Sequence, residues 1–141
     1  MNVDELFEKG LLKKVVPSKE RAKKSLKVAR KYLDEAETIL NVRAYNAAVM
    51  SAYASVFHSA RAILFVDGVG ERSHYAVGRY LSEKHADLGT KWINAFHLYR
   101  RLRHATAYGL DTTVEKEDAE KAIVFARGFL EKVGNYLKMG S

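Results

Sequence analysis

Arg103 occupies a position in a predicted helix where an apolar side chain is expected. It follows Trp92, Phe96 and Tyr99 at spacings of 4, 3 and 4 residues, which is the repeat of a helix face that turns inward. A guanidinium on such a face is costly unless it finds hydrogen-bonding partners, because burial removes its water. A role other than packing is therefore indicated for Arg103.

The neighbours of Arg103 supply groups that could bind an anion and move protons. Arg100 lies three residues before it, so the two guanidinium groups are close on the helix surface. His104 follows directly, and Tyr108 falls at the expected helix end, where its hydroxyl could turn back towards the arginine. A guanidinium binds phosphate, an imidazole moves protons near neutral pH, and a phenol donates a hydrogen bond or stacks. Such a set could cleave RNA without a metal ion, with the ribose 2′-hydroxyl as the nucleophile.

The alternative is a purely structural role. In that case Arg103 pairs with an acidic residue of a neighbouring helix, such as Asp34, Glu35 or Asp118, and Tyr108 only packs the helix end. The residues of this segment leave both interpretations open.

Two histidines from elsewhere in the chain complete the candidate site. His58 lies on the small-residue face of the second long helix, and His74 begins the third helix directly after Ser73. With Arg100 and Arg103 they form our set of candidates for binding a nucleic acid or another anion. His58 also suits a hydrogen-bonded interior position, and the Ser73-His74 pair suits a helix cap. No ligand spacing indicates a metal site, so we expect neither a metal nor another cofactor.

Composition narrows the class of protein. The 141 residues suit a single domain over residues 1–141, and the net charge of +7 favours anionic partners such as RNA or nucleotides. The absence of cysteine excludes disulfides, thiolate metal sites and cysteine nucleophiles. No uninterrupted apolar stretch has the length of a membrane span, and the first residues lack the basic start of a signal peptide. We therefore expect a cytoplasmic protein without a membrane partner.

Apolar repeats predict the helices that position these residues. The fold class indicated is all-α, an antiparallel up-and-down four-helix bundle with an additional short helix, because the chain has one proline and few glycines. The bundle is expected over residues 18–137, after a lead-in over residues 1–16. Its helices are predicted over residues 18–40, 44–66, 73–85, 89–109 and 112–137.

Several helix ends carry recognisable caps. Ser18 is the expected N-cap of the first long helix, Gly109 a natural left-handed cap of the fourth, and Thr112 with Glu115 fits a capping box for the last. The second helix, over residues 44–66, is apolar almost all round, which is typical of the centre of a bundle or of a contact with a second subunit.

Five segments carry a resemblance that spans most of the chain. They are Gly10–Lys14, Pro17–Ala22, Tyr53–Phe65, Arg72–Tyr75 and Arg103–Leu110. In this order they resemble the HEPN domain (higher eukaryotes and prokaryotes nucleotide-binding), specifically its small stand-alone prokaryotic branch of the toxin–antitoxin type. The resemblance covers roughly residues 8–137.

The resemblance implies a dimeric helical bundle that is encoded beside a minimal nucleotidyltransferase as a toxin–antitoxin pair. Active members are metal-independent endoribonucleases that use an arginine, a polar neighbour and then a histidine, with the motifs of two protomers facing a shared cleft. Arg103 matches the arginine and His104 the polar neighbour, whereas Tyr108 stands where the histidine would be. A tyrosine moves protons less readily than an imidazole at neutral pH. Tyr108 would also be the residue that a partner transferase modifies.

Three functions remain open, so the sequence does not decide whether the protein is an enzyme. The first is a ribonuclease-type toxin or a catalytically degenerate relative, acting as a homodimer with Arg103, His104 and Tyr108 at the interface groove. The second is a non-catalytic module that holds a nucleotide or docks a nucleotidyltransferase. The third is a protein-interaction scaffold.

Overall fold

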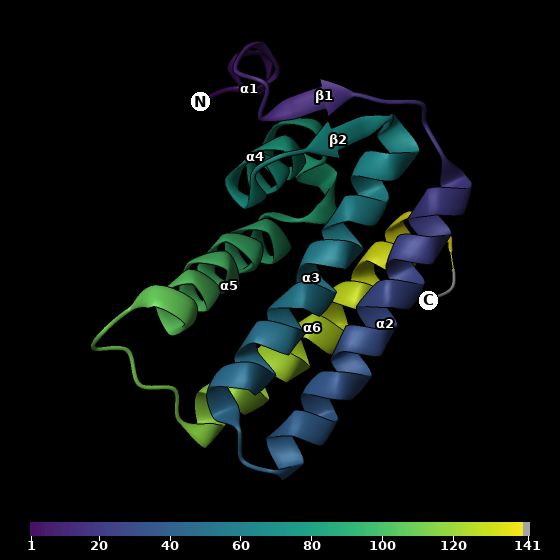
Figure 1. Ribbon diagram of the computed structural model, residues 1–141. Coiled ribbons are helices and arrows are strands. Elements are labelled where there is room, and N and C mark those ends of the chain that lie inside the picture. The colour runs from purple at the N-terminus through teal and green to yellow at the C-terminus, as the bar shows by residue number, and fades with distance from the viewer. Residues whose placement is uncertain (140–141) are drawn as a thin grey trace.

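The computed structural model describes residues 1–139 and consists of helices packed around one core, with a small two-stranded sheet at one end (Figure 1). The long helices are α2 (Lys19–Asn41), α3 (Tyr45–Asp67), α5 (Thr90–Tyr108) and α6 (Lys116–Tyr136). The shorter elements are α1 (Val3–Glu8), β1 (Leu12–Lys14), β2 (Val69–Glu71), α4 (His74–Lys84) and the 3₁₀ turn η1 (Ala86–Leu88). The all-α fold class expected from the sequence is confirmed.

The helix α2 begins and ends close to the predicted positions. Ser18 caps it, since its Oγ accepts a hydrogen bond from the backbone N–H of Arg21 at 3.0 Å. Its apolar repeat faces inward against α3 and α6. The side chains of this repeat without exposed surface are Ala22, Leu26, Ala29, Leu33 and Ala36.

The helix α3 runs through the middle of the bundle. It packs against α2, α5 and α6, and its buried residues extend from Ala48 to Leu64. By length and composition it could cross a membrane, but 56% of its apolar window is buried inside the bundle, as expected for a central helix. The apolar side chains on its several faces therefore pack against other helices of the same chain.

A two-stranded antiparallel sheet, which the sequence did not indicate, joins the amino-terminal segment to the end of α3. Leu12 pairs with Glu71, and Lys14 pairs with Val69. Between α3 and β2, Gly68 has a left-handed conformation with φ at 75°, and a β-carbon on it would lie 2.7 Å from the carbonyl oxygen of Val15. This turn therefore requires glycine.

The amino-terminal segment also holds α4 in place. The backbone N–H of Val3 donates to the Glu83 carboxylate at 3.3 Å, and the Arg79 Nε donates to the carbonyl oxygen of Met1 at 3.1 Å. At the other end of α4, the predicted cap forms and the first helical residue is His74. The position of His74 thus depends on contacts made by the first residues of the chain.

Two predicted caps at the connection between α5 and α6 are wrong. Gly109 has φ at −72° and ψ at 136°, which is extended backbone and not a left-handed cap. The helix α6 begins later than Thr112, with a capping box formed by Glu115 and Asp118. The extended connection brings Val114 into the core, where it is 8% exposed, and this burial competes with an earlier helical turn.

Candidate functional site

Arg103 lies at the place where the inward face of α5 reaches the protein surface. Of the four residues in the expected stripe, Phe96 is fully buried, whereas Trp92, Tyr99 and Arg103 keep part of their surface exposed. The guanidinium is therefore less buried than the spacing predicts, and it is accessible from outside.

The acidic residues of the structure leave Arg103 without an ion pair. Within residues 1–139, the ion pairs involve other cations, and Asp34, Glu35 and Asp118 do not pair with Arg103. The structural alternative considered from the sequence is therefore not what the described residues form. The charge of Arg103 is available to an external anion.

Arg103 lines a pocket of about 260 Å³ where α3, the start of α4 and α5 meet. The pocket brings together three of the residues singled out in the sequence, namely Arg103, His58 and His74. Its other walls come from α3 and consist of Met50, Tyr53, Ala54 and Phe57. One cation and two imidazoles thus share a small, partly apolar cavity.

His74 is held in a defined orientation at the edge of this pocket. Its Nδ1 lies 2.9 Å from the Tyr53 hydroxyl, and its ring stacks on Phe57 with 4.0 Å between centroids and 14° between planes. Burial lowers the pKa of His74, and the charge of Arg103 lowers it further. At neutral pH the imidazole is therefore neutral and can accept a proton.

Tyr53 orients His74 through the hydrogen bond between its hydroxyl and the Nδ1 of His74. It is 3% exposed, and burial raises the pKa of its phenol, so the hydroxyl stays protonated. In the tautomer in which the Nδ1–H of His74 donates to the Tyr53 oxygen, the Nε2 lone pair of His74 is free to act as a base.

His58 is a second neutral imidazole in the same pocket. Its ring stacks on Tyr32 with 5.5 Å between centroids and 5° between planes, and its Nδ1 lies 3.5 Å from a terminal nitrogen of Arg61. Burial lowers the pKa of His58, with smaller contributions from Arg61 and His74. The described contacts place His58 on the wall of the pocket that faces α2.

Arg100 adds positive charge without lining the pocket. Its guanidinium lies over the Tyr75 ring at 5.6 Å from the centroid, and its Nε is buried without a hydrogen-bond partner among residues 1–139. Its charge contributes to the lowered pKa of His74. Arg100 therefore reinforces the positive potential that an anion would meet beside Arg103.

His104 and Tyr108 lie outside the pocket. Both are exposed, Tyr108 to 66%, and their rings contact each other with 5.0 Å between centroids. Because α5 stays helical through Tyr108, its side chain does not turn back towards Arg103. The three residues of the sequence-derived catalytic set are thus divided between the pocket and the outer surface of the last helical turn.

Sequence reasoning missed the α3 residues that shape the pocket. Tyr53 and Phe57 are four residues apart, and His58 follows directly, so helical spacing places them on neighbouring parts of one face. This spacing was visible in the sequence. What it could not supply is that α4 begins opposite this face and brings His74 onto Phe57.

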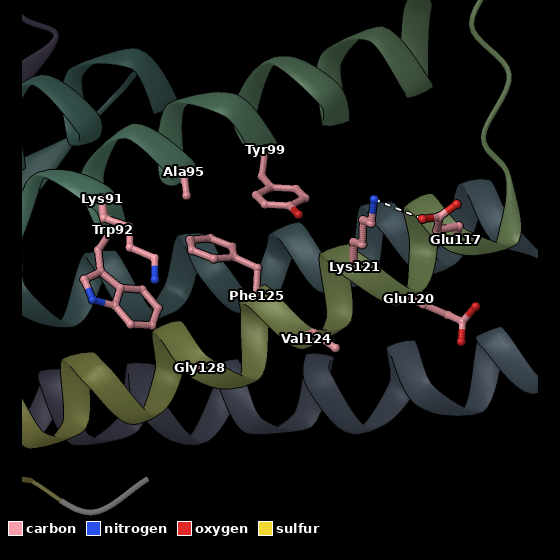
Figure 2. Close-up of a pocket in the computed structure, with 10 residues that line it drawn as sticks. All are labelled: Lys91, Trp92, Ala95, Tyr99, Glu117, Glu120, Lys121, Val124, Phe125 and Gly128. Carbon is pink, nitrogen blue, oxygen red and sulfur yellow. Dashed lines mark ion pairs between the residues drawn. The ribbon is translucent and has the colours of Figure 1, made fainter.

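A larger and more apolar groove of about 650 Å³ lies between α5 and α6 (Figure 2). Its floor is aromatic, since the Phe125 ring stacks on Tyr99 at 4.8 Å and on Trp92 at 5.9 Å between centroids. Its charged residues are Lys91, Glu117, Glu120 and Lys121. The groove holds no histidine, so proton transfer near neutral pH is better supported at the pocket of Arg103.

The polar groups of the smaller pocket favour an anion over a cation. Within the described part of the chain, no group of three histidine, cysteine, aspartate or glutamate residues is placed to hold a metal ion. Arg103 instead presents a guanidinium, whose donors match the oxygens of a phosphate.

Comparisons with known proteins place these residues in a family. The model of the HEPN domain matches residues 22–136, which include every residue of the pocket. A protein of Methanocaldococcus jannaschii named "Putative toxin MJ0605" is 28% identical over 140 residues, covering 92% of this chain and 97% of its own. A second protein of the same organism, named "Putative toxin MJ0142", is 25% identical over 122 residues, covering 84% of this chain and 83% of its own.

Proposed function

The chain belongs to the HEPN domain family, and on that premise we propose that it is a toxin-type protein that cleaves RNA without a metal ion. The names of the two similar proteins of Methanocaldococcus jannaschii support the toxin type. The observation that carries the proposal is that Arg103, unpaired among the described residues, shares a pocket with the neutral imidazole of His74.

The proposed reaction is an internal transfer within the RNA backbone. Arg103 binds the phosphodiester and the negative charge that grows on it, while His74 accepts the proton of the ribose 2′-hydroxyl. The 2′-oxygen attacks phosphorus, the bond from phosphorus to the 5′-oxygen breaks, and the leaving oxygen takes a proton from water. The products are a 2′,3′-cyclic phosphate and a 5′-hydroxyl end.

This assignment keeps Arg103 from the sequence-derived set and gives the proton transfer to His74. The reason is position, since His74 lines the pocket and both His104 and Tyr108 lie outside it. The exposure of Tyr108 leaves it accessible to a protein partner. A minimal nucleotidyltransferase that binds or modifies Tyr108 stays a prediction, to be tested by co-purification.

We expect the cleavage rate to fall in mild acid. The pKa of His74 is lowered from 6.5, so the imidazole is neutral at pH 7 and loses its base function only when the pH falls through the lowered pKa. The kcat/KM of cleavage in excess EDTA should stay level from about pH 8 to about 7. Once the pH falls below the lowered pKa of His74, kcat/KM should fall by up to about tenfold per pH unit.

Two variants test whether His74 is the base that this pH profile reports. His74→Asn should abolish the acidic limb together with most of the activity, whereas His104→Asn should keep both. An acidic limb that persists unchanged in His74→Asn would contradict the assignment of the base to His74.

We also propose that the chain forms a homodimer and that the groove between α5 and α6 is its contact surface. Val124 is 65% exposed at the edge of the aromatic floor, and the rim carries both lysines and glutamates (Figure 2). A rim with both charges around an apolar centre can complement a second copy of itself across a twofold axis.

Val124→Glu is expected to convert the dimer to a monomer in light scattering at micromolar concentration, because it places a charge at the edge of the aromatic floor, where the second copy would cover it. Glu131→Lys, an exposed charge change elsewhere on α6, should leave the mass unchanged. A wild-type protein that is monomeric at this concentration would contradict the proposed dimer.

A further inference from the structure

A second hollow lies next to the pocket of Arg103, on the other side of His58. This hollow, of about 190 Å³, lies between α2 and α3, and His58 lines both. Its remaining walls are Arg21, Lys24, Ser25 and Val28 from α2 and Arg61 and Phe65 from α3. The two helices lie side by side along this stretch (Figure 1). The two hollows therefore adjoin across one imidazole.

Two arginines that line the second hollow lie over the ring of Phe65. The Arg61 guanidinium lies 5.1 Å from the centroid of Phe65, and the Arg21 guanidinium lies 5.8 Å from the same centroid. Arg61 is also held by an ion pair between its Nε and Glu71, which fixes its position and offsets part of its charge. Arg21 forms no ion pair among the described residues. Arg21 is thus the cation best able to bind a phosphate there.

The imidazole of His58, which lies between the two hollows, stacks on the ring of Tyr32. Tyr32 stacks on His58 in nearly parallel planes and is 36% exposed, so part of its ring faces solvent. Because burial lowers the pKa of His58, its imidazole is uncharged at neutral pH. Unpaired nucleobases stack on such rings whatever their sequence.

Helical geometry aligns these α2 residues into one row. At 100° per residue, Arg21 and Tyr32 are about 20° apart around α2, and Lys24 lies about 60° from Arg21. Among residues 1–139, Lys24 forms an ion pair with Glu20 alone, and both side chains are more than 70% exposed, so this pair is weak and exchangeable. The row presents positive charge at one end and an aromatic ring further along α2.

We propose that these features form a binding track for single-stranded RNA that leads out of the cleavage pocket, an inference that rests on the proposed function. The strand passes from Arg103 across His58, an unpaired base stacks on Tyr32, and a phosphate further along the strand binds Arg21, about 16 Å away along α2. Single-stranded RNA fits because a base paired in a duplex cannot offer its face to Tyr32. The track extends the site to nucleotides beyond the one that is cut.

The test separates binding from cleavage with an RNA that cannot react. A fluorescent 12-nucleotide oligouridylate with 2′-deoxy sugars lacks the nucleophile but keeps its phosphates and bases, and its Kd follows from fluorescence polarisation. Arg21→Ala and Tyr32→Ala should each weaken binding by about tenfold. Arg21→Ala should also reduce the slope of log K against log salt by about 0.7, the value for one lost phosphate contact on a single strand.

Lys23→Ala is the matched control, because it removes one exposed charge from the same helix, about 200° around α2 from Arg21. The proposal expects its Kd to stay within about twofold of wild type, and a duplex of equal length to bind more weakly. Equal loss in Arg21→Ala and Lys23→Ala, or no loss in either, would overturn the track. All variants replace exposed side chains, and unchanged circular-dichroism melting verifies their folding.

Cleavage of the all-ribose oligonucleotide shows which of the two proposals fails. Binding that depends on Arg21 without any cleavage supports the track and contradicts the proposed ribonuclease. Cleavage that depends on Arg103 with kcat/KM unaffected by Arg21→Ala contradicts the track and supports the ribonuclease.

Discussion

Replacing Arg103 by alanine is expected to lower the rate of metal-free RNA cleavage by about 100- to 1000-fold. Removal of one preorganised donor to a developing anion typically costs this much. The protein should remain folded, because Arg103 is only partly buried and forms no ion pair among the described residues. The measurement is single-turnover cleavage of labelled RNA in EDTA, together with thermal melting of wild type and variant.

Arg101→Ala provides the control for this prediction. Arg101 is exposed on the same helix and lies about 200° around α5 from Arg103. Its replacement by alanine therefore removes an equal charge without changing the pocket. Its rate should stay within about threefold of wild type. Equal losses in the two variants would reduce the role of Arg103 to general electrostatic attraction. Arg103→Lys should recover only part of the rate, since an ammonium lacks the planar fork of a guanidinium.

Phe96→Ala is expected to lower the free energy of unfolding by about 3–5 kcal/mol. The Phe96 ring has no exposed surface and contacts Tyr53 and Phe129, with 6.1 and 6.3 Å between ring centroids. Its removal leaves a cavity between α3, α5 and α6 that these neighbours cannot close completely. Urea unfolding followed by circular dichroism gives the difference directly.

The matched control for the cavity is Leu98→Ala on the same helix. Leu98 is 54% exposed, so its truncation should change the free energy of unfolding by less than about 0.5 kcal/mol. A similar loss in both variants would show that the effect does not depend on burial of the Phe96 ring, and helix propensity could not explain it because alanine is the better helix former at both positions. Because Phe96 supports Tyr53, the cavity should also loosen the hydrogen bond to His74.

The long helices were predictable because local rules and the core agree along them. In α2, the repeat that runs from Ala22 to Ala36 is also the buried face, and Ser18 caps the helix as its side chain dictates. In α3, the apolar residues on several sides indicated the centre of a bundle or a contact with a second subunit, and the packing against three helices confirms the central position. Periodicity suffices where one element alone determines what is buried.

The errors lie where tertiary contacts compete with local signals. The strand β1 exists because it pairs with β2, more than fifty residues later, and three residues carry too little pattern to reveal this. Thr112 has the correct type for a cap, but the burial of Val114 extends the chain and moves the helix start to Glu115. Such outcomes depend on partners that are distant in sequence.

In the candidate site, too, some features followed from local sequence and others depended on distant contacts. Spacing along α5 identified Arg103, and the types of His58 and His74 marked them as candidates, but their meeting in one pocket requires α3, α4 and α5 to converge. Spacing also placed His104 and Tyr108 beside Arg103, where a regular helix instead directs them to the outer surface. Neighbours in sequence were therefore weaker guides to the pocket than His74 and His58, which are 29 and 45 positions away from Arg103.

The attachment of α4 to the first residues of the chain has a practical consequence for any recombinant assay. The Met1 carbonyl accepts from Arg79, and its amino group lies 3.4 Å from the Tyr75 hydroxyl, next to His74. An affinity tag fused ahead of Met1 would crowd these contacts and shift the imidazole. Activity measured on an amino-terminally tagged protein would then understate that of the untagged protein.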